Sequence, residues 1–118
     1  RAHLVRAALD SLCFRVRDIV DRLADRPQVL RVDGGLTANR YLLQRQADVL
    51  GIPIAVARMP ETTALGAAAT AGVTAGVIDP ADLEHLTGGG TRVEPRDAEA
   101  AVHDYQSWRG FADIAAGL

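Results

Sequence analysis

The sequence contains no lysine, and all 13 of its basic residues are arginines. This absence excludes phosphate-binding loops that depend on a lysine of their own. The net charge is -2 and the pI is about 5.9. The chain therefore lacks the basic excess with which proteins bind nucleic acid through a broad surface or anchor to anionic membranes. We expect neither nucleic acid nor a membrane among its partners.

Cysteine and aromatic residues are also scarce. The single cysteine, Cys13, cannot form an internal disulfide or a multi-cysteine zinc site, and it suits a reducing compartment such as the cytoplasm. His3, His85 and His103 lie far apart, so we expect no metal site in this chain. No apolar run approaches the roughly 20 residues of a membrane span. Hydrophobic residues still make up 48% of the sequence, which is enough for one core of Ala, Leu, Val and Ile.

The pattern of apolar residues predicts alternating helices and strands. Apolar residues recur at steps of three and four from Leu4 to Leu23, which predicts a helix that Pro27 ends. Two short apolar runs, residues 29–33 and 52–57, are typical of buried strands. The remaining predicted elements are helices at 38–50, 63–75, 81–86 and 97–116, a loop at 87–90 and an extended link at 93–95.

This order predicts an α/β fold. Strands that alternate with helices pair in parallel through right-handed crossovers. Two strands alone leave both edges of a sheet unpaired, so we expect further strands from chain upstream of Arg1. We interpret residues 1–76 as the core and residues 77–118 as a helical tail.

The first candidate site is the turn between the first predicted strand and the next helix. Asp33, Gly34 and Gly35 end the strand, and Asn39 lies in the first turn of the helix. Ligands of open α/β sheets bind at this end of the strands, where glycines and a helix start expose backbone N–H groups. The Asn39 amide can both donate to and accept from a purine or ribose. The alternative is a tight turn capped by Asn39 or Thr37, with Asp33 as an anchor of the loop or as a catalytic acid.

The second candidate is the stretch of small residues at 61–68, ETTALGAA, at the start of the third predicted helix. Tight helix packing explains such a composition, and a hinge between rotating domains is the functional alternative. The run of glycines at 88–90 follows no strong strand and is interpreted as a flexible connector.

Several segments together resemble one family. The turn sequence LRVDGG with Asn39 and the helix start ETTALGAA are the most specific of them. The matching segments are residues 1–9, 14–18, 30–39, 44–53 and 61–68. This ordered set resembles the C-terminal part of the FGGY family of carbohydrate kinases, and it is most similar to the glycerol kinase branch.

The resemblance implies an actin-like, ribonuclease-H-like ATPase domain, in which two domains close around ATP and Mg²⁺. It implies that Gly34 and Gly35 bind the nucleotide, that Asn39 lies beside the adenosine, and that residues 61–68 form an interdomain hinge. The implied reaction moves the γ-phosphoryl group of ATP to a hydroxyl of glycerol, with xylulose or gluconate as alternative substrates. The catalytic base and the polyol-binding residues would precede Arg1, so we expect no catalytic residue here and no activity of the chain alone.

A second hypothesis is a non-catalytic domain that assembles with copies of itself or with a partner. A two-stranded sheet with an alanine-rich helix leaves apolar surface and strand edges uncovered. We therefore expect a homo-oligomer.

Overall fold

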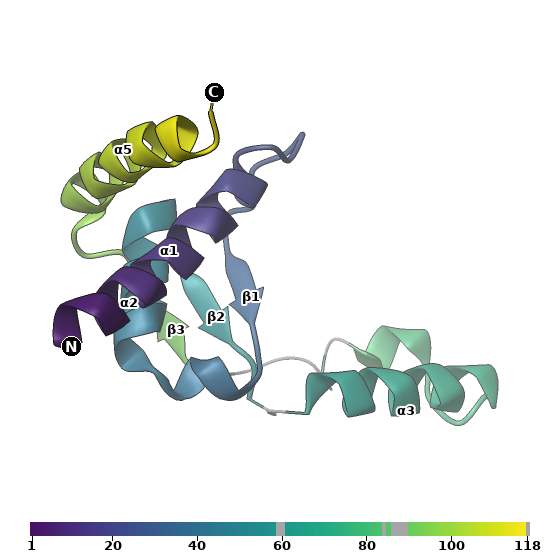
Figure 1. Cartoon of the computed structure of the whole chain (residues 1–118). Coiled ribbons are helices and arrows are strands. Elements are labelled where there is room, and N and C mark those ends of the chain that lie inside the picture. Colours follow the sequence, from purple (N-terminus) through teal and green to yellow (C-terminus); the bar gives the residue numbers. More distant parts are fainter. Residues whose placement is uncertain (59–60, 84, 86–89, 118) are drawn as a thin grey trace.

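The computed structural model describes residues 1–58, 61–83, 85 and 90–117 (Figure 1). The α/β class is confirmed, because helices alternate with strands along the chain. The elements are α1 (Ala2–Val20), β1 (Leu30–Val32), the 3-10 helix η1 (Gly35–Ala38), α2 (Arg40–Leu50), β2 (Ile54–Val56), α3 (Thr62–Thr74), the 3-10 helix η2 (Pro80–Asp82), β3 (Arg92–Val93) and α5 (Ala98–Ala115). No helix in the described ranges is long and apolar enough to cross a membrane.

The described strands form one sheet of order β1-β2-β3. β1 and β2 are parallel, with Leu30 opposite Ile54. β3 is antiparallel to β2, with Val93 opposite Ile54. The prediction of only two strands is therefore wrong. β3 was missed because two residues are too few to show the alternation by which strands are recognised.

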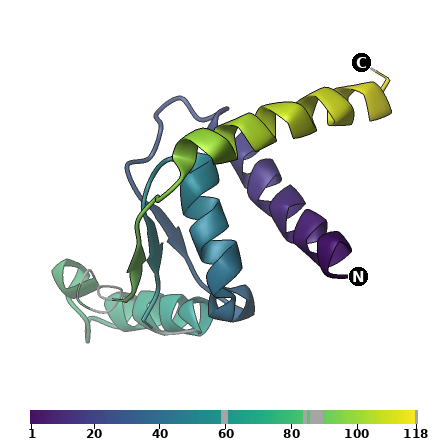
Figure 2. The same cartoon turned by 90° about the vertical axis from the view of Figure 1, so that its left-hand side faces the viewer.

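The helices of the main body lie on one side of the sheet. In Figure 2, α2 lies against the sheet, and α1 and α5 lie beyond α2. One buried cluster joins α1, α2 and α5 through Phe14, Val49 and Tyr105. A second cluster joins α1 and α2 to the sheet through Val20, Leu50 and Ile54. α2 is therefore the central element, packed on both sides.

α1 packs with a different face from the one its periodicity selects. Four apolar residues of the predicted stripe are exposed: Leu4, Leu12, Ile19 and Leu23. The helix instead buries Cys13, Phe14 and Val20. It ends at Val20, before the predicted stop at Pro27, and Asp21 follows as its C-cap. An apolar stripe thus remains on the solvent side of α1.

α3 extends away from the sheet, and none of its residues is buried (Figure 1). A close contact in α3 occurs at Gly72, outside the stretch for which tight packing was predicted, where a Cβ would overlap the side chain of Ile78. A Cβ at Gly66, within the ETTALGAA stretch, would meet open space. The composition of that stretch is therefore not explained by packing within the described chain.

The tail contains more than helices. The predicted helix at 81–86 begins as η2, and residues 84 and 86 lie outside the described residues. The predicted loop at 87–90 is described only at Gly90, whose φ of +133° and approach to the Val56 carbonyl leave no room for a side chain. The predicted helix at 97–116 is present as α5.

Candidate functional site

The candidate site is the turn that connects β1 to α2. Gly34 has a φ of +90° and a ψ of 177°, a conformation that residues with a Cβ rarely adopt. The Thr37 hydroxyl donates to the Gly34 carbonyl at 2.7 Å, and the Thr37 backbone N–H donates to the same oxygen at 3.1 Å. The Asn39 backbone N–H donates to Leu36 at 3.0 Å. These bonds fix the turn without any contribution from a ligand.

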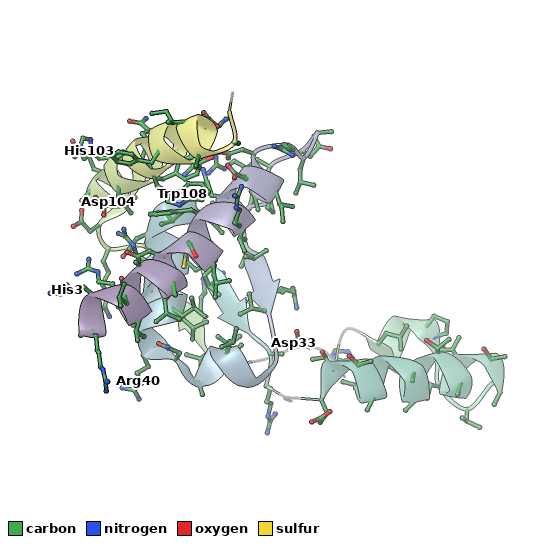
Figure 3. The ribbon with its side chains drawn as sticks, viewed as in Figure 1. His3, Asp33, Arg40, His103, Asp104 and Trp108 are labelled. Carbon is green, nitrogen blue, oxygen red and sulfur yellow. The ribbon has the colours of Figure 1, made fainter. Side chains whose placement is uncertain are left out.

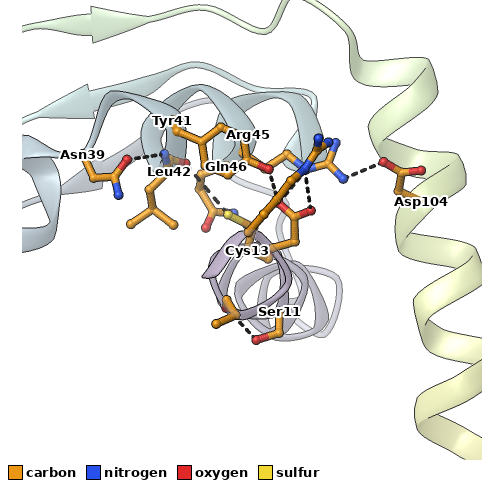
Figure 4. Close-up of polar contacts among 11 residues, drawn as sticks. Ser11, Cys13, Asn39, Tyr41, Leu42, Arg45, Gln46 and Asp104 are labelled. Carbon is orange, nitrogen blue, oxygen red and sulfur yellow. Dashed lines mark hydrogen bonds and ion pairs between the residues drawn. The ribbon is translucent and has the colours of Figure 1, made fainter. Parts of the chain in front are cut away.

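Asn39 is the N-cap of α2. Its Oδ1 accepts a hydrogen bond from the Leu42 backbone N–H at 3.1 Å (Figure 4). The capping alternative is thus confirmed for Asn39, whereas Thr37 bonds to the turn instead. The Asn39 Nδ2 has no hydrogen-bond partner among the described residues, although the side chain is half-buried. The cap therefore holds the amide in one orientation and leaves its N–H groups free to donate.

Gly35 lies between Gly34 and Asn39 and is exposed. Its φ lies outside the left-handed region, and a Cβ there would meet nothing within 4 Å. Neither conformation nor packing in this chain requires glycine at this position. The open space lies beside the start of α2, whose helix dipole presents a positive end there. A ligand can therefore approach the Gly35 backbone closely.

Asp33 is exposed at the end of β1, close to the start of α3 in the view of Figure 3. No described residue donates a hydrogen bond to its carboxylate. The described residues therefore provide no contact through which Asp33 would anchor the loop. Asp33 lines a cavity of about 160 Å³ together with Leu36, Thr37 and Gln46. The cavity opens beside the same turn.

A partly buried ion-pair network connects α2 to α1 and α5, and sequence reasoning missed it. The Arg45 side chain is 11% exposed. Its Nε lies 3.2 Å from Asp10 of α1, and its Nη2 lies 2.6 Å from Asp104 of α5 (Figure 4). Burial alone would lower the pKa of Arg45, but the bonds to Asp104 and Asp10 raise it above its ordinary value. The Tyr41 hydroxyl also donates to Asp10, at 2.6 Å.

Both the start of α5 and the end of α2 are tied down by polar side chains. The buried Asp48 carboxylate accepts from the backbone N–H groups of Arg96 at 2.6 Å and Asp97 at 3.2 Å. At the same end of α2, Arg26 donates to the carbonyl of Leu50, the last residue of the helix, at 2.6 Å. Gly51 ends α2 with a φ of +66°, as its position in the sequence predicts. These contacts hold the C-terminal end of α2, opposite the end that Asn39 caps.

Other reactive residues are structural. Burial raises the pKa of the Cys13 thiol to about 12, and Asp10 adds to this effect. The thiol is therefore protonated and fully buried, as expected for a small core residue. In the part of the chain that the structure describes, no three His, Cys, Asp or Glu residues gather to hold a metal ion.

Comparisons with known proteins agree on one family. The family model "FGGY family of carbohydrate kinases, C-terminal domain" matches residues 1–75. A glycerol kinase of Pseudothermotoga lettingae is 40% identical over 99% of this chain and 25% of its own length. A glycerol kinase of Acidiphilium cryptum is 44% identical over 92% of this chain and 23% of its own length.

Solved structures give the same result. The crystal structure of Plasmodium falciparum glycerol kinase with ADP superposes with a TM-score of 0.82 at 30% identity, covering 97% of this chain and 24% of that chain. A xylulose kinase of Lactobacillus acidophilus superposes with a TM-score of 0.79 at 18% identity, covering 98% and 24%, which supports the fold alone. The chain therefore spans about a quarter of the length of these relatives. With its turn, its sheet order and these matches, the chain belongs to the C-terminal domain of the FGGY family of carbohydrate kinases.

Proposed function

We propose that this chain forms the adenosine-binding wall of a kinase that transfers the γ-phosphoryl group of ATP to glycerol. The observation that carries the proposal is the turn of Gly34, Gly35 and Asn39 at the carboxyl end of β1, which is held by its own hydrogen bonds and is open to a ligand at Gly35. Glycerol kinases at 40% and 44% identity favour glycerol over xylulose or gluconate as the polyol. The similar P. falciparum glycerol kinase was solved with ADP.

The turn residues have separate roles in this proposal. Gly34 and Gly35 let the nucleotide lie against the backbone, because neither carries a side chain that would block it. Asn39 donates from its free Nδ2 to the adenosine, while its Oδ1 stays bound to α2. Mg²⁺ would arrive with ATP and neutralise charge on the phosphates. We assign no residue of this chain to the metal and none to the proton transfer.

We further propose that residues 61–68 form a hinge of the enzyme. Support comes from the resemblance of this stretch to the family's second interdomain segment and from the exposure of α3, in which no residue is buried. Gly66 faces open space, which suits close approach by a neighbouring domain. We also propose that the 118-residue chain alone lacks the catalytic base and shows no kinase activity.

The experiment measures glycerol phosphorylation by the kinase that contains this chain, with xylulose and gluconate as comparison substrates. Asn39→Ser keeps a capping oxygen for α2 but removes the amide donor. We expect it to raise the KM for ATP about tenfold, the effect of losing one good hydrogen bond, and to leave the KM for glycerol unchanged. Asn39→Ala removes the donor and the cap together, so it should have a similar KM for ATP and a lower stability.

Asp97→Ser is the matched control, because Asp97 caps α5 through the Ala100 N–H in the same way. It should change neither KM. An unchanged KM for ATP in Asn39→Ser would contradict the assignment of the adenosine site. Phosphorylation of xylulose or gluconate in preference to glycerol would contradict the assignment of glycerol as the substrate. It would not contradict the assignment of the nucleotide site.

The exposed stripe of α1 supports self-association as a second property. Leu4 is 76% exposed, and Ile19 is 63% exposed. Such a continuous apolar face favours association with a second copy of the chain. Sedimentation should show dimers or larger species that dissociate in Ile19→Arg. A concentration-independent monomer contradicts this expectation.

A further inference from the structure

A second, larger cavity adjoins the first turns of α2. Its volume is about 780 Å³, within the range of about 300–1,000 Å³ that small-molecule sites occupy. Its walls come from the start of α2, the end of β2 and the β3 edge of the sheet. The residues that matter below are Arg40, Arg92, Glu94 and Arg96. We call it the arginine cavity.

The charges of the arginine cavity are unbalanced. Three guanidinium groups line it against the single carboxylate of Glu94. Arg92 is paired with Glu94, at 2.5 Å. The side chains of Arg40 and Arg96 form no ion pair or hydrogen bond within the described residues. Two exposed cations are therefore available to a ligand, and the positive end of the α2 dipole adds to their field.

Another arginine-lined cavity shows that this imbalance is specific. Arg15, Arg22 and Arg109 line a cavity of about 160 Å³ between α1 and α5. There, two carboxylates, Asp18 and Asp113, line the same walls. That cavity is small and its charges are nearly matched, so it offers no comparable attraction for an anion.

We propose that the arginine cavity binds a small anion that carries at least two phosphate or carboxylate groups. A guanidinium group presents its N–H donors in a planar fork that matches both kinds of oxyanion in a bidentate manner. Two such forks on separate elements, Arg40 on α2 and Arg96 after β3, suit a ligand with two anionic ends. Such a ligand also links the start of α2 to the edge strand.

The site is distinct from the proposed nucleotide site. Gly34, Gly35 and Asn39 are absent from the residues that line the arginine cavity. The two sites share only the Thr37 and Ala38 part of the turn. Arg40 directly follows Asn39 in the chain, so the two sites adjoin but have different lining residues. Anion binding can therefore be tested separately from nucleotide binding, with Gly35→Ala as the variant that distinguishes the two sites.

The test is an NMR titration of the full chain, labelled with ¹⁵N, in low-salt buffer without nucleotide. Inorganic pyrophosphate is the phosphate probe, and citrate is the carboxylate probe. We expect saturable shifts of the amides of Thr37, Arg40, Thr91 and Arg92 with at least one probe. The tighter probe identifies the ligand chemistry. Shifts that grow linearly with probe concentration, without saturation, would overturn the proposal.

Four variants sharpen this test. Arg40→Gln and Arg96→Gln should each lower the association constant about tenfold, the effect of losing a charge-assisted hydrogen bond. Arg22→Gln removes an exposed arginine from the small, balanced cavity and should leave the constant unchanged. Gly35→Ala should also leave it unchanged. An equally lowered association constant in Arg22→Gln would show nonspecific attraction of the probe. A lowered association constant in Gly35→Ala would place the anion in the nucleotide site. Either result would refute anion binding in the arginine cavity.

Discussion

Replacing Arg45 with methionine removes the cation that joins three helices. Arg45 on α2 lies 3.2 Å from Asp10 of α1 and 2.6 Å from Asp104 of α5. Methionine keeps most of the aliphatic volume beside Phe14, whose ring centroid lies 5.6 Å from the guanidinium carbon of Arg45. The substitution therefore tests the charge and its hydrogen bonds rather than the packing.

The structure sets the size of the effect. The side chains of Arg45 and Asp10 are 11% and 15% exposed, so the change leaves a nearly buried carboxylate without its main cation. Breaking a buried pair in this way costs about 3–5 kcal/mol. Asp104 is 49% exposed and Tyr41 still donates to Asp10, and both facts reduce the cost. We expect a loss of about 2–3 kcal/mol in the free energy of unfolding.

Arg6→Met is the matched control, because Arg6 pairs with the same Asp10 carboxylate. Its side chain is 62% exposed and its Nε lies 3.7 Å away, so the expected loss is below about 0.5 kcal/mol. Urea denaturation of both variants, followed by circular dichroism, gives the two free energies from the shift in midpoint at unchanged slope. Equal losses in the two variants would refute the reasoning that burial decides the strength of these pairs.

Further predictions concern three residues, Cys13, Gly34 and Tyr105. Because the pKa of the buried Cys13 thiol is raised to about 12, iodoacetamide should label it at about pH 8 only through unfolding; rapid labelling of folded protein contradicts this. The same pKa shift makes the free energy of unfolding fall as the pH rises from 9 towards 12. In Cys13→Ala, this contribution to the fall should be absent. Gly34→Ala should cost about 1–2 kcal/mol in thermal unfolding, because its φ is +90°, whereas Gly35→Ala should stay within about 0.5 kcal/mol. Tyr105→Phe removes a 2.6 Å hydrogen bond to Asp18 and should cost about 1 kcal/mol; an unchanged midpoint in urea would contradict that role.

The elements around the candidate site could be predicted because local signals agree there. Asn39 favours a helix start and Gly51 a helix end, and α2 runs between them. Val32 ends a short apolar run next to two glycines, which is typical of a strand that leads into a tight turn. The turn and the central helix were therefore accessible from short-range chemistry alone.

The long-range pairs could not be predicted in the same way. Arg45 and Asp104 are 59 residues apart, and the paired residues of β2 and β3 are 37 and 39 positions apart. No local period connects such residues, because their contact depends on how α5 crosses α2. The face that α1 buries was misjudged for the same reason: Phe14 faces Tyr105 and Trp108 of α5, whose position the sequence of α1 does not encode.

The most direct test of the proposed adenosine site is a calorimetric titration of the proposed kinase with ADP. Gly35→Ala adds one methyl group to the exposed turn, where it meets no atom of the chain within 4 Å. Gly110→Ala adds the same group to α5, also in open space, and serves as the control. We expect Gly35→Ala to weaken ADP binding at least about tenfold and Gly110→Ala to leave it unchanged. Equal affinity of both variants and the unsubstituted enzyme would contradict nucleotide binding at this turn.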